Sequence, residues 1–252
     1  MNNKNEITDK VQKMYTQFPF PDVDCRMDYG LIILRFLKGL EKKRPGFWQS
    51  AKVMEAGCGT GNTLNHLAEI FPKASFQGVD LTPASLEKAQ EKARSMELKN
   101  IKFQQENILK LNLEEKKFDV ILCIGVLHHT ADMMEGIKRL KAHLADDGVL
   151  ILWLYGKHGR YRLNLNQRFF DLLLADVNDL SEKVVDMEDI LALADGANLR
   201  MTKWFNVKND LSGYIDDARV QSLYEKLGDR DQLLVKDLLL KPDYYTVALE
   251  KE

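Results

Sequence analysis

The sequence predicts a doubly wound α/β fold, in which a mostly parallel β-sheet is covered by helices on both faces. Three observations lead to this prediction. Short apolar runs alternate with helical patterns, alternate glycines follow the first apolar run, and residues 149–155 would be apolar on both faces of a strand. A central parallel strand has this last pattern. Strand–helix repeats of this kind are joined by right-handed crossovers.

The length and composition fit a single domain. The chain has 252 residues, of which 45% are hydrophobic and 29% charged, and this is enough for a sizeable core. We find no internal repeat and no low-complexity linker. We therefore expect one domain over residues 1–252, with an N-terminal helical lid at 1–50, a ligand-binding core at 51–155, and a helical insertion with the last two strands at 156–252.

Charge and cysteine content restrict the partners and the compartment. A formal net charge of -2 gives no electrostatic attraction to nucleic acid or to an anionic membrane. Cys25, Cys58 and Cys123 have no Cys-x-x-Cys spacing, and their odd number leaves one unpaired, so reduced thiols are expected. The polar first ten residues predict no signal peptide, and the longest apolar run is shorter than the roughly 20 residues that span a bilayer. We expect a cytoplasmic protein.

The secondary structure elements can be placed in order from their patterns. Apolar spacing predicts a helix through Ile7 and Tyr15, which Phe18-Pro19-Phe20-Pro21 stops because proline cannot continue a helix. A second helix is expected to end near Pro45-Gly46. Strands after the first are expected at 75–79, 101–105, 118–124, 149–155, 199–205 and 244–249.

Two helix ends have recognisable sequence features. Thr82-Pro83 is expected to be an N-cap followed by proline in the first helical position. A helix with apolar residues from Met133 to Leu144 is expected to end at Asp146-Asp147-Gly148, in a turn that favours glycine. In the less regular C-terminal part we expect helices around 169–177, 190–194 and 223–239.

The glycine-rich segment is the most specific motif. Glu55 lies at the end of the first apolar run, and Gly57, Gly59 and Gly61 follow at alternate positions. Glycine permits sharp turns and leaves no Cβ beside a ligand. The pattern Glu-x-Gly-x-Gly-x-Gly resembles motif I of the class I S-adenosylmethionine-dependent methyltransferases. It differs from the dinucleotide fingerprint Gly-x-Gly-x-x-Gly, because the third glycine comes one residue earlier.

The resemblance covers residues 51–155, and the final strand more loosely. It implies a Rossmann-like sheet of seven strands with an antiparallel last strand, S-adenosyl-L-methionine as cofactor, and N-terminal helices that cover the cofactor. It also implies a small-molecule or metabolite acceptor. The glycine segment would bind the cofactor through the residues Glu55, Gly57, Cys58, Gly59 and Gly61.

The following strands supply further residues. Asp80 ends the second strand, where this fold places an acid on ribose hydroxyls, and a carboxylate can accept hydrogen bonds from both of them. Leu81 would accompany it at the cofactor. Gln105-Glu106-Asn107-Ile108 resembles the family segment that meets the adenine. Most family members have Asp at the position of Asn107, and an amide oxygen can still accept from the adenine amino group.

Residues 118–130 resemble motif IV and the loop after it. The end of this strand, Cys123 and Ile124, would face the methionine part of the cofactor. His128 and His129 follow, and either is a candidate general base, since imidazole titrates near neutral pH. The alternative, that both histidines only shape the loop, stays open. No metal site is expected, because the other histidines have no ligand-like neighbours in the sequence.

Three functional interpretations follow. The first is an S-adenosylmethionine-dependent methyltransferase with a small-molecule acceptor. The second is an inactive, cofactor-binding partner protein. The third is a nicotinamide-dependent oxidoreductase, which the glycine spacing and Glu55 disfavour. A basic segment at 157–168 offers two interpretations of its own: it could contact an anionic substrate or form a solvated loop.

Overall fold

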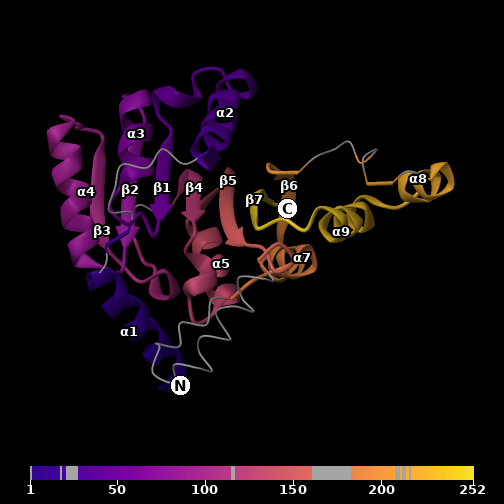
Figure 1. Ribbon diagram of the computed structural model, residues 1–252. Coiled ribbons are helices and arrows are strands. Elements are labelled where there is room, and N and C mark those ends of the chain that lie inside the picture. Colours follow the sequence, from indigo (N-terminus) through magenta and orange to yellow (C-terminus); the bar gives the residue numbers. More distant parts are fainter. Residues whose placement is uncertain are drawn as a thin grey trace.

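The computed structural model describes residues 2–17, 19–20, 28–114, 117–160, 183–207, 211, 214–215 and 217–252. It contains a seven-stranded sheet in the order β3-β2-β1-β4-β5-β7-β6 (Figure 1). The strands are β1 (Lys52–Ala56), β2 (Ser75–Asp80), β3 (Ile101–Gln105), β4 (Phe118–Ile124), β5 (Leu144–Tyr155), β6 (Leu199–Trp204) and β7 (Tyr244–Lys251).

The strand directions confirm the predicted fold class. β1 is parallel to β2 and β4, β2 to β3, and β4 to β5. β7 lies between β5 and β6 and is antiparallel to both. Six strands therefore point in one direction, and the last one in the opposite direction.

The helices form a layer on each face of the sheet. They are α1 (Asn2–Gln17), α2 (Asp28–Lys43), α3 (Asn62–Ile70), α4 (Pro83–Ser95), α5 (Met133–His143), α7 (Met187–Gly196), α8 (Ala218–Glu225) and α9 (Asp229–Leu240), with short 3₁₀ turns η1 (Phe47–Gln49), η2 (Ile108–Lys110) and η3 (Leu127–His129). α2 and α3 pack on one face, and α5 and α7 on the other. Two neighbouring residues of β4 show the alternation, because Ile121 belongs to the core under α5 and Leu122 to the core under α3.

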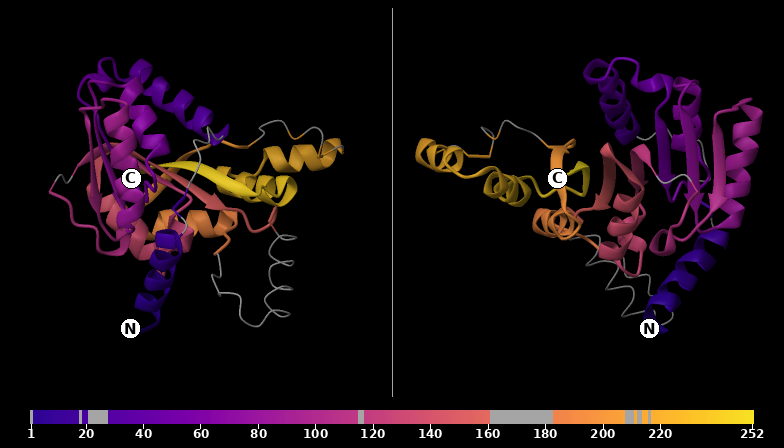
Figure 2. Two further views of the ribbon diagram at one scale, coloured as in Figure 1. Left: turned by 60° about the vertical axis from the view of Figure 1, so that its left-hand side comes forward. Right: turned by 180° about the vertical axis from the view of Figure 1, so that it is seen from behind.

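Two segments extend from this layered body. α1 lies at the carboxyl ends of β1 and β2, at the edge of the sheet to which their arrows point (Figure 1). α8 and α9 extend away from the sheet on the side of β6, in every view of Figures 1 and 2. The carboxyl edge of the β1-β2 part of the sheet is therefore covered by the N-terminal helix, and the flank at β6 carries the C-terminal helices.

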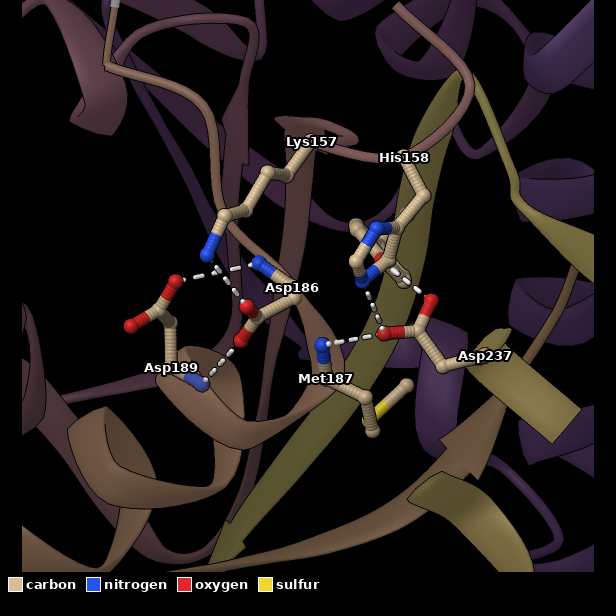
Figure 3. Close-up of polar contacts among 7 residues, drawn as sticks. Lys157, His158, Asp186, Met187, Asp189 and Asp237 are labelled. Atoms are coloured by element: carbon tan, nitrogen blue, oxygen red, sulfur yellow. Dashed lines mark hydrogen bonds and ion pairs between the residues drawn. The ribbon is translucent and has the colours of Figure 1, made fainter. Parts of the chain in front are cut away.

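A buried carboxylate fastens α9 to the sheet. Asp237 is 3% exposed and accepts hydrogen bonds from the Tyr245 hydroxyl and, at 2.9 Å, from the Met187 backbone N–H. Its Oδ2 also lies 3.7 Å from His158 Nε2 (Figure 3). Nearby, Lys157 Nζ pairs with Asp186, the N-cap residue of α7, at 2.8 Å. Polar contacts thus join β7, α7, α9 and the segment after β5.

One helix end differs from the prediction. α5 ends at His143, and β5 begins directly at Leu144, which pairs with Phe118 and is fully buried. The expected glycine turn at Asp146–Gly148 is therefore wrong. Gly148 is required for a different reason: a Cβ there would lie 2.9 Å from the Phe118 carbonyl oxygen, where β4 and β5 approach closely at a register shift.

The other expected elements occur close to their predicted positions. Thr82 is the N-cap of α4 and Pro83 its first residue, as predicted. The expected helices around 190–194 and 223–239 correspond to α7, α8 and α9. Cys25 and the expected helix around 169–177 lie outside the described residues. Among those that are described, no helix is long and apolar enough to cross a bilayer.

Candidate active site

A cavity of about 540 Å³ opens at the carboxyl edge of the sheet. It lies beside the ends of β1, β2, β4 and β5, the edge at which ligands bind in open α/β sheets. The helix α1 covers it, contributing Thr8, Val11, Met14 and Tyr15 to its wall. Ten of the residues proposed from the sequence line this cavity: Glu55, Gly57, Cys58, Gly59, Asp80, Leu81, Asn107, Ile108, Ile124 and His129.

The glycine loop takes a conformation that side chains would prevent. Gly57 has φ 74° and Gly61 has φ 76°, both in the left-handed region. A Cβ at Gly57 would lie 2.3 Å from a methyl carbon of Val126, and one at Gly61 would lie 2.8 Å from the Cβ of Ala89. Gly61 does not line the cavity, and its contact with the cofactor stays a prediction. It allows α3 to pack against α4.

Glu55 carries a buried oxygen without a partner. The residue lines the cavity and is 4% exposed, and its Oε2 makes no hydrogen bond to any described residue. Burial, reinforced by the charge of Asp80, raises the pKa of Glu55 to about 8. A buried polar atom of this kind calls for a ligand group, and a cation or hydroxyl would satisfy it.

Asp80 organises the loop from the neighbouring strand. Its Oδ2 accepts a hydrogen bond from Gly59 N–H and its Oδ1 one from Thr82 N–H, each at 2.9 Å. Burial raises its pKa, and these backbone bonds counteract the rise. The Thr82 hydroxyl and the Leu81 N–H also lower this pKa by hydrogen bonding, and the carboxylate lines the cavity, where it can meet a bound ligand. The carbonyl of Leu81, the next residue, accepts from the amide of Gln12 on α1 at 3.2 Å.

The segment after β3 forms another part of the cavity wall. Asn107 caps the turn η2, and its Oδ1 accepts from Leu109 N–H at 2.9 Å. One acceptor site of that amide oxygen is therefore used within the protein. Glu106, which directly precedes Asn107 in the same segment, also lines the cavity, although it was not itself predicted to be a site residue.

The two histidines after β4 occupy different positions. His129 lines the cavity, whereas His128 does not; it is 1% exposed, and neither ring nitrogen has a hydrogen-bond partner among the described residues. Burial lowers the pKa of His128 to about 2 and that of His129 to about 4, and the positive charge of Arg160 adds to both shifts. Both imidazoles are therefore neutral and weakly basic. A catalytic role stays a prediction, and the geometry limits direct contact to His129.

The far end of the cavity is aromatic. Trp153 and Tyr155, at the carboxyl end of β5, line it together with Tyr15 and His129. Their rings pack edge to face in two pairs. The ring centroids of Trp153 and Tyr155 are 5.1 Å apart, and those of Tyr15 and His129 are 6.5 Å apart. Neither β5 residue was among the site residues predicted from the sequence. Their place at the end of a predicted parallel strand was the available indication.

Cys123 lies in the core, not at the site. It is fully buried between the sheet and α5, and burial raises the pKa of its thiol to about 12. Its contact with the cofactor stays a prediction. Neighbouring strand residues face opposite sides of the sheet, and Ile124 is the one of the two that lines the cavity. Within the described part of the chain, no group of three or more histidine, cysteine or acidic residues could hold a metal.

Comparison with known proteins identifies relatives of this chain. The family model described as "Methyltransferase domain" matches residues 49–209. The malonyl-[acyl-carrier protein] O-methyltransferase of Bacillus cereus is 31% identical over 137 residues, which are 54% of this chain and 47% of that protein. The trans-aconitate 2-methyltransferase of Deinococcus radiodurans is 33% identical over 124 residues, 49% of this chain and 44% of that protein.

Solved structures show the same fold. The magnesium protoporphyrin IX methyltransferase of Synechocystis PCC 6803, crystallised with bound SAH, superposes with a TM-score of 0.65 at 15% identity, covering 98% of this chain and 100% of that one. The chain spans less than half the length of the two curated relatives. Since the family model covers more than half of the sequence, the chain belongs to the methyltransferase domain family, with the class I fold whose cofactor is S-adenosylmethionine.

Proposed function

We propose that this protein transfers the methyl group of S-adenosylmethionine to a small-molecule acceptor. The observation that carries the proposal is the cavity at the carboxyl edge of the sheet, which joins an acidic end from β1 and β2 to an aromatic end from β4 and β5. The curated relatives, named as methyltransferases of malonyl-[acyl-carrier protein] and of trans-aconitate, support methyl transfer, and the second name is that of a free small molecule.

The acidic end fits the cofactor. The unpartnered Oε2 of Glu55 would receive the amino group of its methionine part, and Asp80 would receive the ribose hydroxyls. Asn107 and Ile108 would hold the adenine. The cavity volume of about 540 Å³ lies within the range of small-molecule and cofactor sites.

The aromatic end would hold the acceptor. When bound, the cofactor supplies an electrophilic methyl group on a positively charged sulfur. The protein's part is to align the acceptor with that methyl, and the rings of Tyr15, Trp153 and Tyr155 offer fixed apolar surfaces for this purpose. The α1 helix, which carries Tyr15, would exclude water from the cavity.

Titration calorimetry tests the cofactor, and label transfer tests the reaction. S-adenosylmethionine and S-adenosylhomocysteine should both bind, and NAD should not. Tritium from the labelled methyl group should then pass to small molecules of a deproteinised cell extract. Binding of NAD alone would exclude the proposal; cofactor binding without transfer would favour the inactive partner protein. The cytoplasmic location and the lack of nucleic-acid partners stay predictions from the sequence.

A further inference from the structure

The cavity differs in charge from one end to the other. Three carboxylates line it, all from the β3-β2-β1 half of the sheet: Glu55 and Asp80 lie at or near the ends of β1 and β2, and Glu106 directly follows β3. On the β4-β5 half, no carboxylate lines the cavity among the described residues. The acceptor end would therefore present aromatic rings without negative charge from the described part of the wall.

A guanidinium group stands at this end. The Cζ of Arg160 lies 3.7 Å from the centre of the Tyr155 ring, a stacked cation–π arrangement on a residue that lines the cavity. The positive charge of Arg160 also acts on the two histidines, because it contributes to the lowered pKa of His128 and of His129. Arg160 itself does not line the cavity, but its permanent positive charge lies against the ring of Tyr155, which does.

We propose that the methyl acceptor is a carboxylate and that Arg160 is the residue that selects for its negative charge. The inference rests on the proposed function and names its substrate class. The sulfonium of the cofactor and the guanidinium of Arg160 are both cationic, so together they attract an anionic acceptor and repel an ammonium group. The aromatic wall favours an acid with a flat apolar part.

The chemistry of a carboxylate suits the groups that are present. One carboxylate oxygen forms a bond to the methyl carbon, the bond between sulfur and methyl breaks, and its electron pair goes to sulfur. The products are a methyl ester and S-adenosylhomocysteine, and no proton is transferred. A hydroxyl acceptor would need a base, and His129, with a pKa of about 4, is a weak one.

Benzoate, benzamide and benzylamine provide matched probes, because they share the ring and differ in charge. Their affinities for the protein saturated with S-adenosylhomocysteine can be measured by ligand-detected NMR titration. We expect benzoate to bind at least about tenfold more tightly than the other two. Arg160→Gln should remove this preference, and Arg160→Lys, which keeps the charge, should retain part of it. Arg230→Gln is the control, since Arg230 is an exposed partner of Asp195 at the junction of α9 and α7.

The outcomes separate this inference from the proposed function. Equal affinities, a preference for benzylamine, no detectable benzoate binding, or an unchanged preference in Arg160→Gln would overturn the carboxylate assignment. The tritiated products offer an independent readout, because mild alkali releases methanol from methyl esters but not from methyl ethers or methylamines. Alkali-stable label would overturn the carboxylate and leave methyl transfer intact. Failure to bind S-adenosylhomocysteine would instead remove the proposed function.

Discussion

The buried carboxylate of Asp237 on α9 accepts a hydrogen bond from the hydroxyl of Tyr245 on β7. Burial, together with the negative charge of Asp237, raises the pKa of Tyr245. The same carboxylate receives the backbone N–H of Met187 at the start of α7. One side chain therefore holds two C-terminal helices and the antiparallel strand in register.

Tyr245→Phe should destabilise the protein by about 1–3 kcal/mol, because it leaves a buried carboxylate with one partner fewer. Urea denaturation measures the loss. Tyr244→Phe is the matched control, since the adjacent tyrosine of the same strand stacks on Trp153 and donates no hydroxyl hydrogen bond to a described residue. An equal loss of unfolding free energy in both variants would show that the hydrogen bond from Tyr245 to Asp237 does not contribute to stability.

Glu55→Gln should change stability and cofactor affinity in opposite directions. The folded state raises the pKa of Glu55 from 4.5 to about 8, so its contribution to stability is complete below pH 4.5 and is lost as the pH rises toward 8. The uncharged variant should therefore be more stable at pH 7 to 8, by about 3–4 kcal/mol. Thermal melts from pH 5 to 8 measure this difference. Calorimetry should show weaker S-adenosylmethionine binding; a variant that binds normally would remove the contact to the amino group.

Asp80→Ala should weaken cofactor binding by about 1.5–3 kcal/mol, the range for hydrogen bonds to charged groups. The dissociation constant would then rise by roughly ten- to a hundredfold or somewhat more. Because Asp80 also receives the Gly59 and Thr82 N–H groups, part of the effect would come from a looser glycine loop. Asp80→Asn, which keeps an acceptor oxygen, separates the two. An unchanged constant in folded Asp80→Ala would make Asp80 a turn residue.

The N-terminal helix should order further when the cavity is filled. Residues 8, 11, 14 and 15 of α1 line it, and Gln12 donates to the Leu81 carbonyl. Hydrogen exchange in peptides from residues 2–20 should slow with cofactor, and Gln12→Ala should reduce this protection. Peptides from α8, which projects away from the sheet, serve as the internal reference. Identical exchange with and without cofactor would make α1 a fixed part of the fold.

The buried histidines should make the protein acid-sensitive. The folded state lowers both pKa values, from 6.5 to about 4 for His129 and about 2 for His128. Below pH 6.5 the unfolded chain therefore binds more protons than the folded one. The free energy of unfolding is highest above pH 6.5 and decreases as the pH falls toward 4. Each histidine contributes up to about 1.4 kcal/mol per pH unit. Urea denaturation from pH 4.5 to 7 should show a shallower dependence in His128→Leu/His129→Leu; parallel curves would contradict the shifts.

The positions of the strands along the chain, and of two acidic residues at their ends, followed from local sequence. Glu55 and Asp80 each end an apolar run, and parallel strands bring such ends to one edge, so their proximity could be predicted. The glycine loop could be predicted as well, because a left-handed backbone at alternate residues favours glycine at those positions.

Neighbouring residues could not be told apart by the same reasoning. Cys123 and Ile124 are both apolar at the end of a strand buried on both faces, so alternation alone does not say which one meets the cavity. His128 and His129 pose the same problem in a 3₁₀ turn. Trp153 and Tyr155 belong to the site because β5 lies next to β4, and the packing of the whole sheet decides that.

The place of β7 between β5 and β6 has a consequence for the order of synthesis. β6 leaves the ribosome about 40 residues before β7, yet its partner within the sheet is β7 alone. Until residues 244–251 emerge, the edge of β5 stays open and β6 has no strand to join. A nascent chain stalled before Tyr244 would therefore expose two unpaired strand edges, which are sites for wrong association. The flank that carries α8 and α9 completes its folding last.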